Sequence, residues 1–490
     1  MKLHTILHYL NPLLPQEGKN IEIESIENDN RKVKPGSLFI CIKGYRVDGH
    51  DFAKDAEKKG AVVVLAEKEL PLQIPVIVVK DTKRAITLLA DFFYGHPTQK
   101  INLIGITGTN GKTTTSHLIE KIFSDQGQVT GLIGTMYTKM AGEKFETKNT
   151  TPEGLTLQKT FRQMVDRNVS TAIMEVSSHA LVEGRVHGCD FDIAVFTNLT
   201  QDHLDYHKTM DEYRRAKGLL FSQLGNAFHD HKPKYAVLNA DDVASQEYKS
   251  ITAARVITYG IDHEADFRAT NMKMDVNGTS FDLINPFGSH QVKMKMIGKF
   301  SVYNVLASIA TSAVAGVPLN HIIASLEEVE GVSGRFEAVN AGQDFSVIVD
   351  YSHTPDSLEN ALNTVRQLAK KRIFVVVGCG GDRDKSKRPL MAKIACTLST
   401  DPVFTSDNPR SEDPDMILRD MEAGVTGETF KSIPDRRKAI QFVVNEAKEG
   451  DAILIAGKGH ETYQIIGQEI FDFDDRIVAK EAIEERMKCR

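Results

Sequence analysis

The stretch "LIGITGTNGKTTTSHLIEKI", Leu103 to Ile122, decides the fold of the region around it. It runs from an apolar segment through a glycine-rich turn into a helical pattern, which is the order typical of a phosphate-binding loop. The usual G-x-x-x-x-G-K-[ST] spacing places a glycine five positions before Gly111, where this chain has Ile106. We therefore predict a nucleotide-binding α/β domain with a shortened loop.

The side chains of this loop suit the binding of phosphate groups. Gly108 and Gly111 let backbone N–H groups approach an anion, and the helix that begins near Thr113 adds its dipole. Lys112 adds a positive charge, and the Thr113 hydroxyl can bind Mg²⁺. The alternative is a plain strand-to-helix turn with a glycine-rich cap.

Length and composition indicate a large globular protein with several domains. A chain of 490 residues predicts roughly three domains at about 150 residues each. The net charge of −6 does not favour nucleic acid as a partner. The 5 cysteines form no C-x-x-C pair, and no apolar run approaches the roughly 18 residues of a membrane span. We expect a cytoplasmic monomer, with "MKLHTILHYLNPLLP" as its first helix and not as a signal peptide.

Short apolar strands alternate with helical patterns along the whole chain, which predicts α/β domains with parallel sheets. We place the domains at residues 1–98, 99–330 and 331–490, with an antiparallel piece at "MDVNGTSFDLI" and a hinge near Gly331 to Gly334. Polar residues gather after the strands, at the edge where open α/β sheets bind ligands. The expected strands are 37–42, 61–66, 75–79, a strand that begins at Ile101, 171–176, 192–199, 235–239, 346–351, 372–378, 402–406 and 452–457.

Two further clusters contain residue types that bind metals. Glu175 ends a predicted strand, and "SSHAL" begins two residues later, although in isolation a helix-capping turn is the better explanation of that pattern. "TNLTQDHLDYHKTMDEYRRAK" then offers His203, Asp205, His207 and Lys217. Imidazoles and carboxylates at short spacing can bind a metal, and the alternative is a solvated helix with charge pairs.

Nine motifs stand in one order over almost the whole chain: "GTNGKTTT", "EVSSHAL", "TNLTQDHLDYH", "EYRRAK", "GRFE", "VDYSHTPDSL", "GCGGDRDKSKRP", "SDNPR" and "AGKGHE". In these motifs the chain resembles the Mur ligases, and the shortened loop is that family's form. The resemblance implies a central P-loop-type ATPase domain with a parallel sheet, a C-terminal Rossmann-like α/β domain and a smaller N-terminal α/β domain that binds a UDP-sugar. It also implies that the protein is an ATP-dependent amide-bond-forming ligase of peptidoglycan precursor synthesis, which adds meso-2,6-diaminopimelate to UDP-N-acetylmuramoyl-L-alanyl-D-glutamate through an acyl phosphate.

The resemblance assigns residues to the ATP and metal sites. It implies that Thr113 and Glu175 hold one Mg²⁺, that His203 binds a second, and that Lys217 is carbamylated and can bridge a metal. The implied catalytic residues are Lys112, Glu175, His203 and Lys217. The implied ATP-binding residues are Gly108, Thr109, Asn110, Gly111, Lys112, Thr113, Thr114, Asn304, Arg335 and Asp350.

The resemblance also assigns the other two substrate sites. For the sugar nucleotide it implies Asn30, Thr150, Thr151, Ser177, Glu183 and Arg185, where Asn30 replaces the usual Ser and Glu183 the common Gln. For diaminopimelate it implies Arg383, Asp407, Asn408, Pro409, Arg410, Gly457 and Glu461. The chemistry of D-N-P-R agrees, because Arg410 can grip the distal carboxylate with its planar fork while Asp407 and Asn408 accept from the ammonium.

Four other functions are alternatives. A lysine-adding ligase or a folylpolyglutamate synthetase lies within the wider superfamily, and the N-terminal domain and D-N-P-R argue against both. A P-loop NTPase switch would explain the first motif only. A non-catalytic sugar-nucleotide binder would not need Lys112, Glu175 and His203 together.

Overall fold

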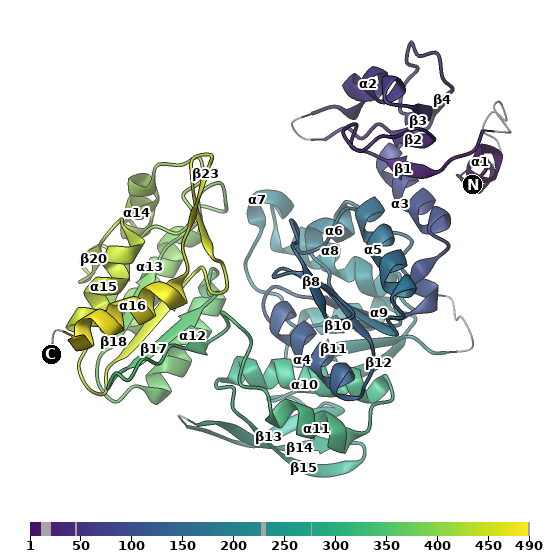
Figure 1. Ribbon diagram of the computed structural model, residues 1–490. Helices are drawn as coiled ribbons and strands as arrows, with labels where there is room; N and C mark the ends of the chain where they lie inside the picture. The colour runs from purple at the N-terminus through teal and green to yellow at the C-terminus, as the bar shows by residue number, and fades with distance from the viewer. Residues whose placement is uncertain (11–20, 45–46, 227–231, 276, 489–490) are drawn as a thin grey trace.

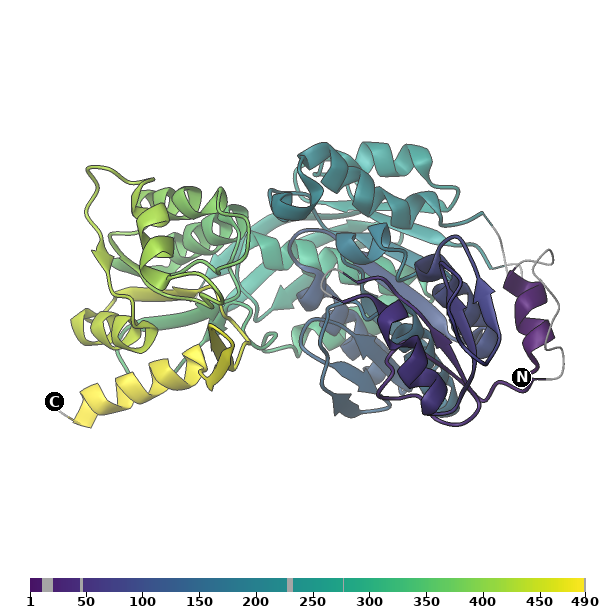
Figure 2. The same cartoon turned by 90° about the horizontal axis from the view of Figure 1, so that it is seen from above.

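The protein consists of three α/β units, each built on its own sheet (Figure 1). The computed structural model describes residues 1–10, 21–44, 47–226, 232–275 and 277–488. In both views the N-terminal and C-terminal units lie on different sides of the central one, and the two termini are far apart (Figure 2). The α/β class predicted from the alternating pattern is confirmed.

The N-terminal unit contains a four-stranded parallel sheet in the order β1-β2-β3-β4. Apolar side chains of α1 and α3 cover one face, and those of α2 cover the other. The elements are β1 (Ser25–Glu27), β2 (Ser37–Ile40), β3 (Ala61–Ala66), β4 (Val76–Val78), α1 (Leu3–Leu10), the 3₁₀ helix η1 (Gly49–Phe52), α2 (Ala53–Lys58) and α3 (Thr82–Phe93). The 3₁₀ helix η2 (Pro97–Lys100) leads into the central unit, and the predicted first helix is present up to Leu10, beyond which the segment lies outside the described residues.

The central unit has an eleven-stranded sheet in the order β15-β14-β13-β12-β11-β10-β5-β9-β6-β7-β8. The middle of the sheet, from β13 to β6, is parallel, and antiparallel pairs extend it at both edges. Its strands are β5 (Asn102–Thr107), β6 (Thr130–Ile133), β7 (Thr138–Met140), β8 (Glu143–Phe145), β9 (Thr171–Glu175), β10 (Ile193–Phe196), β11 (Tyr235–Asn239), β12 (Arg255–Gly260), β13 (Phe267–Asp275), β14 (Gly278–Asn285) and β15 (Gly288–Met294).

Successive side chains of the central strands point to opposite faces of the sheet, and each face packs in its own apolar core. In β5, Ile104 and Ile106 face a core shared with α4, α10 and α11, whereas Leu103 faces a core shared with α5, α8 and α9. A strand buried on both faces reads as a nearly continuous apolar run, as "LIGI" does. The helices are α4 (Lys112–Asp125), α5 (Gly154–Asp166), α6 (Ser178–Val182), α7 (Leu204–His207), α8 (Met210–Ser222), α9 (Ala244–Ile251), α10 (Lys299–Val314) and α11 (Leu319–Glu327).

The C-terminal unit repeats this three-layer arrangement around a six-stranded sheet, β16-β17-β21-β18-β19-β20. Helices α12, α13 and α14 cover one face, and α15 and α16 cover the other. The elements are β16 (Glu337–Ala338), β17 (Ser346–Asp350), β18 (Ile373–Val377), β19 (Asp401–Phe404), β20 (Lys431–Ser432), β21 (Ala452–Ala456), the hairpin β22 (Tyr463–Ile466) and β23 (Glu469–Asp472), α12 (Pro355–Leu368), α13 (Lys387–Leu398), α14 (Pro414–Glu422), α15 (Arg436–Glu446) and α16 (Asp475–Lys488).

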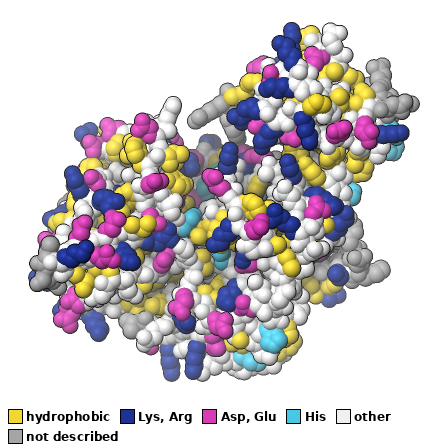
Figure 3. Space-filling model, in the orientation of Figure 1, with side chains coloured by type: hydrophobic (Ala, Val, Ile, Leu, Met, Phe, Trp, Pro, Cys, Tyr) yellow, Lys and Arg dark blue, Asp and Glu magenta, His cyan; other side chains and the backbone are white. Residues whose placement is uncertain are grey.

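Gly334, in the connection between the central and C-terminal units, packs closely against the C-terminal unit. This residue has φ +67°, and a Cβ there would collide with the backbone of His460, so only glycine fits. A space-filling view shows a hollow between the two units (Figure 3). No described helix is long and apolar enough to cross a membrane. The domain limits at 98 and 330 stay a prediction.

Candidate active site

Three adjoining cavities lie between the central and C-terminal units. A cavity of about 360 Å³ surrounds the glycine-rich loop, a second of about 340 Å³ lies beside α10 and α12, and a third of about 700 Å³ lies at the carboxyl ends of β18 and β21. We call them the loop cavity, the nucleoside cavity and the amino-acid cavity. Tyr351 lines all three, so they form one continuous site at the edge where open α/β sheets bind ligands.

The glycine-rich loop joins β5 to α4 as the sequence predicts. Gly111 adopts φ +86° immediately before the helix, and a Cβ there would lie 2.4 Å from the side-chain oxygen of Asn304. Lys112 folds back, and its Nζ donates to the carbonyl oxygens of Gly108 (2.9 Å) and Thr109 (2.8 Å). The first N–H groups of α4 and the Lys112 ammonium therefore face one anion-binding space.

Oxygen ligands for a hard cation stand next to the loop. Thr113 Oγ1 lies 3.1 Å from Glu175 Oε2, and Thr135 donates to the same carboxylate through both its N–H and its hydroxyl. Glu175 is fully buried at the end of β9. A hydroxyl and a carboxylate beside a phosphate site fit Mg²⁺, which binds oxygen and usually keeps phosphate and water ligands.

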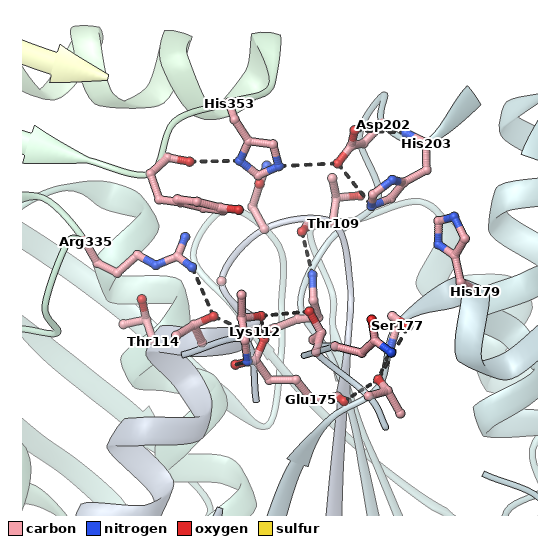
Figure 4. Close-up of a pocket in the computed structure, with 18 of the residues that line it drawn as sticks. Thr109, Lys112, Thr114, Glu175, Ser177, His179, Asp202, His203, Arg335 and His353 are labelled. Atoms are coloured by element: carbon pink, nitrogen blue, oxygen red, sulfur yellow. Dashed lines mark hydrogen bonds and ion pairs between the residues drawn. The ribbon is translucent and has the colours of Figure 1, made fainter. Parts of the chain in front are cut away.

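Arg335 reaches this space from the C-terminal unit (Figure 4). Its Nη2 donates to Thr113 Oγ1 at 3.1 Å, and its guanidinium lies over the Tyr351 ring. Its buried Nε finds no hydrogen-bond acceptor among the described residues. An unsatisfied guanidinium donor beside a phosphate loop is suited to an anion.

Lys217 is buried beneath the loop, with an exposed fraction of 1%. Its Nζ donates to Gly108 O at 2.9 Å and lies over the Tyr213 ring. Burial, and after it the charge of Lys112, holds the pKa of Lys217 well below its ordinary value. The amine is therefore in a setting that favours its neutral form.

His203 and Asp202 face the loop from the segment before α7 (Figure 4). His203 has φ +55°, an uncommon left-handed conformation for a residue other than glycine, and burial lowers its pKa to about 3. A neutral imidazole can bind a metal through nitrogen. Asp202 is buried and interacts with His353 (3.7 Å) and Lys387 (3.8 Å) of the C-terminal unit.

The nucleoside cavity contains the remaining residues that the resemblance assigned to ATP. Asn304, Arg335 and Asp350 all line it. Asp350 accepts from the backbone N–H of Phe336, which follows Arg335, at 2.7 Å. Burial raises the pKa of Asp350, and its hydrogen bonds and Arg335 oppose that shift.

Four of the residues assigned to the sugar nucleotide lie together in the loop cavity: Thr150, Thr151, Ser177 and Arg185. Arg185 donates to Thr151 O at 3.0 Å and pairs with Glu183 at 2.6 Å, so the unusual carboxylate is neutralised by its neighbour. Asn30 is not among the residues that line the three cavities, and its amide donates to Asp55 within the N-terminal unit at 2.7 Å.

The amino-acid cavity is lined by six of the seven residues assigned to diaminopimelate, all except Pro409: Arg383, Asp407, Asn408, Arg410, Gly457 and Glu461. Arg410 Nη1 donates to Gly381 O at 2.8 Å, and among the described residues its Nε and Nη2 have no acceptor within hydrogen-bond distance. The guanidinium thus has donors to offer a ligand carboxylate.

Several residues of the site were not identified from the sequence. Thr135, which binds Glu175, follows the short strand β6. Asp202 stands beside His203 in "TQDHLD", and its neighbours from the C-terminal unit are more than 100 residues away in sequence. A carboxylate next to a candidate histidine ligand was the available signal, whereas nothing in the local pattern marks Thr135.

Comparison with known proteins assigns the three units to one family. The Mur ligase middle domain matches residues 106–312, the Mur ligase glutamate ligase domain residues 334–459, and the Mur ligase family catalytic domain residues 22–94. UDP-N-acetylmuramoyl-L-alanyl-D-glutamate--2,6-diaminopimelate ligase of Bacillus licheniformis is 60% identical over 484 residues, 99% of each chain. The same-named protein of Listeria monocytogenes serotype 4b is 58% identical over 488 residues, again 99% of each.

Solved structures agree with the sequence matches. A structure of a UDP-N-acetylmuramoyl-L-alanyl-D-glutamate--2,6-diaminopimelate ligase is 33% identical, with a TM-score of 0.69 over 99% of this chain and 100% of that one. The MurF ligase of Thermotoga maritima in complex with ADP is 17% identical, with a TM-score of 0.66 over 96% and 97%, and supports the fold alone.

The chain belongs to the Mur ligase family. It is an ATP-dependent ligase that forms amide bonds.

Proposed function

We propose that this protein adds meso-2,6-diaminopimelate to the D-glutamate carboxylate of UDP-N-acetylmuramoyl-L-alanyl-D-glutamate, a step of peptidoglycan precursor synthesis in the cytoplasm. ATP is converted to ADP and phosphate. The observation that carries the proposal is the continuity of the three cavities, since Asp202, His203 and Arg383 line both the loop cavity and the amino-acid cavity. A terminal phosphate, a carboxylate and an amine can therefore meet at one place.

ATP would occupy the nucleoside and loop cavities. Lys112 and the N–H groups at the start of α4 would bind its phosphates, and Asn304, which lines the nucleoside cavity, would contact the base. Arg335 offers its unsatisfied Nε to the terminal phosphate. The residues that would hold Mg²⁺ are Thr113 and Glu175, with His203 and carbamylated Lys217 for a second ion. Bound Mg²⁺ would offset the repulsion between phosphate and carboxylate.

The acceptor's carboxylate would enter the loop cavity from the side of Thr151, Ser177 and Arg185. One carboxylate oxygen attacks the γ-phosphorus, the bond to the β,γ-bridging oxygen breaks, and ADP leaves. The product is an acyl phosphate, whose phosphate is a good leaving group. Lys112 and Arg335 compensate the charge that develops on the transferring phosphoryl group.

Diaminopimelate would lie in the amino-acid cavity with its reacting amine toward Arg383 and His203. The neutral amine attacks the acyl carbon, and the tetrahedral intermediate expels phosphate. The nitrogen releases one proton to solvent, which leaves the amide. At the far end of the substrate, Arg410 would pair with the second carboxylate through a planar fork. Asp407 and Glu461 would accept from the second ammonium. Glu461 replaces Asn408, which we expected from the sequence in this role, because Asn408 Oδ1 already accepts from Lys458 and from the Ile465 N–H. L-lysine lacks that carboxylate and would leave the Arg410 guanidinium unpaired.

The proposal is tested by the mass of the product. The purified protein is incubated with ATP, Mg²⁺ and the UDP-dipeptide, together with either diaminopimelate or lysine. We expect a product that is heavier than the UDP-dipeptide by one diaminopimelate residue. One ADP should form for each molecule of product, and lysine should give little product. ADP formed without any amide product would identify a P-loop NTPase switch, and a dominant lysine product would identify the lysine-adding alternative.

A further inference from the structure

A fully buried lysine lies behind the amino-acid cavity, and the reaction described above does not use it. Lys458 follows Gly457 at the end of β21 and has an exposed fraction of 0%. Its Nζ lies 3.1 Å from Asn408 Oδ1 and 3.0 Å from Glu461 Oε2. Lysine is almost never fully buried unless it is paired, because its charge loses hydration there. The arrangement therefore needs an explanation beyond packing.

The partners of Lys458 are themselves fixed by the lysine. Asn408 Oδ1 accepts from Lys458 and from the Ile465 N–H at 2.9 Å, so both of its lone pairs are used. Asn408 Nδ2 donates to Glu461 Oε2 at 2.8 Å. The amide thus has one orientation, and Glu461 Oε2 accepts from both Lys458 and Asn408. Among the described residues no side chain donates to Glu461 Oε1, so that oxygen can accept from a ligand.

The hairpin β22–β23 holds the backbone on either side of Asn408; it stands at the top of the C-terminal unit in Figure 1. Gln464 Nε2 donates to Asp407 O at 2.7 Å. The Arg410 N–H donates to Ile465 O at 3.1 Å, and Arg410 O accepts from the Gly467 N–H at 2.7 Å. Arg410 has φ +52°, a conformation that persists in a bulky residue only when its surroundings enforce it.

We propose that Lys458 is a positioning residue for the amino-acid substrate. It fixes the Asn408 amide, which joins the Asp407–Arg410 segment to the hairpin, and it aims Glu461 at the substrate ammonium. Asn408 is then an internal support of the segment, and Asp407, Arg410 and Glu461 contact the substrate. This inference rests on the proposed function, because it assigns the amino acid to this cavity.

The test compares Lys458→Met with Lys458→Arg in the full-length protein. We expect Lys458→Met to raise KM for diaminopimelate by about tenfold or more, since displaced binding groups lose much of their effect. KM for ATP and for the UDP-dipeptide should stay near the wild-type values, because neither site contacts Lys458. Lys458→Arg keeps a charged donor and should recover part of the loss. If Lys458→Met does not fold, Lys458→Gln, which keeps a donor without the charge, takes its place.

The matched control is Arg372→Met. Arg372 pairs with buried Asp451 at 2.8 Å, at the opposite end of the same sheet. Its loss should lower the melting temperature without changing KM for diaminopimelate. The inference is overturned if the Lys458 variants lower stability and leave all three KM values unchanged, or raise all three together. If the wild type makes no diaminopimelate product, the proposed function fails and the role of Lys458 fails with it. If the wild type makes the product but the Lys458 variants keep its KM for diaminopimelate, only the role of Lys458 is overturned.

Discussion

Lys112 and Lys217 donate to the same oxygen, the carbonyl of Gly108, each at 2.9 Å. Two ammonium groups at one acceptor repel each other, and burial adds to the cost of charging Lys217. Its pKa is accordingly well below the ordinary value. A neutral amine is the form that reacts with CO2, so the shared oxygen favours carbamylation of Lys217, and a carbamate would carry a negative charge toward Lys112.

The first prediction is that Lys217 acts as its carbamate. Lys217→Ala should lose most ligation, and added bicarbonate should not restore it. A short carboxylic acid should restore part of the activity by occupying the vacant position. With ¹³C-labelled bicarbonate, the wild type should give a carbamate carbon signal that Lys217→Ala lacks. An ordered, unmodified ammonium at Lys217 in a crystal with ATP and Mg²⁺ bound would refute the carbamate.

The second prediction concerns stability in buffer free of CO2 and metal. Because the folded-state pKa of Lys217 lies below its unfolded value of 10.5, the unfolded protein binds the extra proton between those two values. The cost of burying Lys217 is therefore absent above pH 10.5 and grows as the pH falls. Lys217→Met should be more stable than the wild type at pH 7, by a difference that shrinks toward pH 10 by at most about 1.4 kcal/mol per pH unit.

Thermal unfolding of both proteins at several pH values measures this difference. Lys217→Met should have a higher melting temperature at pH 7 although it no longer ligates. A difference that stays constant from pH 7 to pH 10 would mean that Lys217 is charged throughout in the folded protein.

The third prediction is that Lys112→Ala abolishes ligation and leaves the fold intact. Lys112 makes two hydrogen bonds to its own loop, which together stabilise the protein by about 1–3 kcal/mol. Circular dichroism should therefore show a native spectrum, whereas amide formation should fall by at least about 10²-fold. Near-normal ligation by this variant would remove the phosphate-binding role of Lys112.

The fourth prediction concerns the contact between the loop and the C-terminal unit. Asn110 Nδ2 donates to Asp356 Oδ2 at 2.9 Å, and Thr200 donates to the same oxygen at 3.4 Å. Asp356→Ala should weaken the closure of the C-terminal unit on the loop, so the radius of gyration in solution should increase. KM for ATP should rise several-fold, because one or two hydrogen bonds of this kind are lost. Glu359→Ala, on an exposed position of the same helix, is the control. An unchanged KM for ATP and an unchanged radius would show that closure does not use this contact.

Sequence reasoning predicted the strands of the three sheets where apolar runs are long, as at "AVVVLA" and "AILIAG", because buried parallel strands leave that signal. It did not predict β1, of three residues, or β20, of two, whose pairing depends on tertiary partners. The antiparallel pairing of β13 and β14 was expected from "NG", although residue 276 lies outside the described part. The motifs identified the loop and Glu175. They did not include Thr135, and they gave no role to Lys458 of "AGKGHE", because the contacts of both residues come from distant segments of the chain.

The central claim is that the amino-acid cavity selects diaminopimelate by binding its second carboxylate. The most direct test measures kcat/KM for diaminopimelate and for lysine in the wild type, Arg410→Ala and Arg410→Lys. The wild type should prefer diaminopimelate by roughly 10⁴–10⁵, as sites built around a polar group do. Arg410→Ala should lose activity steeply with diaminopimelate and little with lysine, and Arg410→Lys should recover only part, since an ammonium cannot reproduce the fork. Equal losses for both amino acids would contradict the claim, because Arg410 would then support the cavity without reading the substrate.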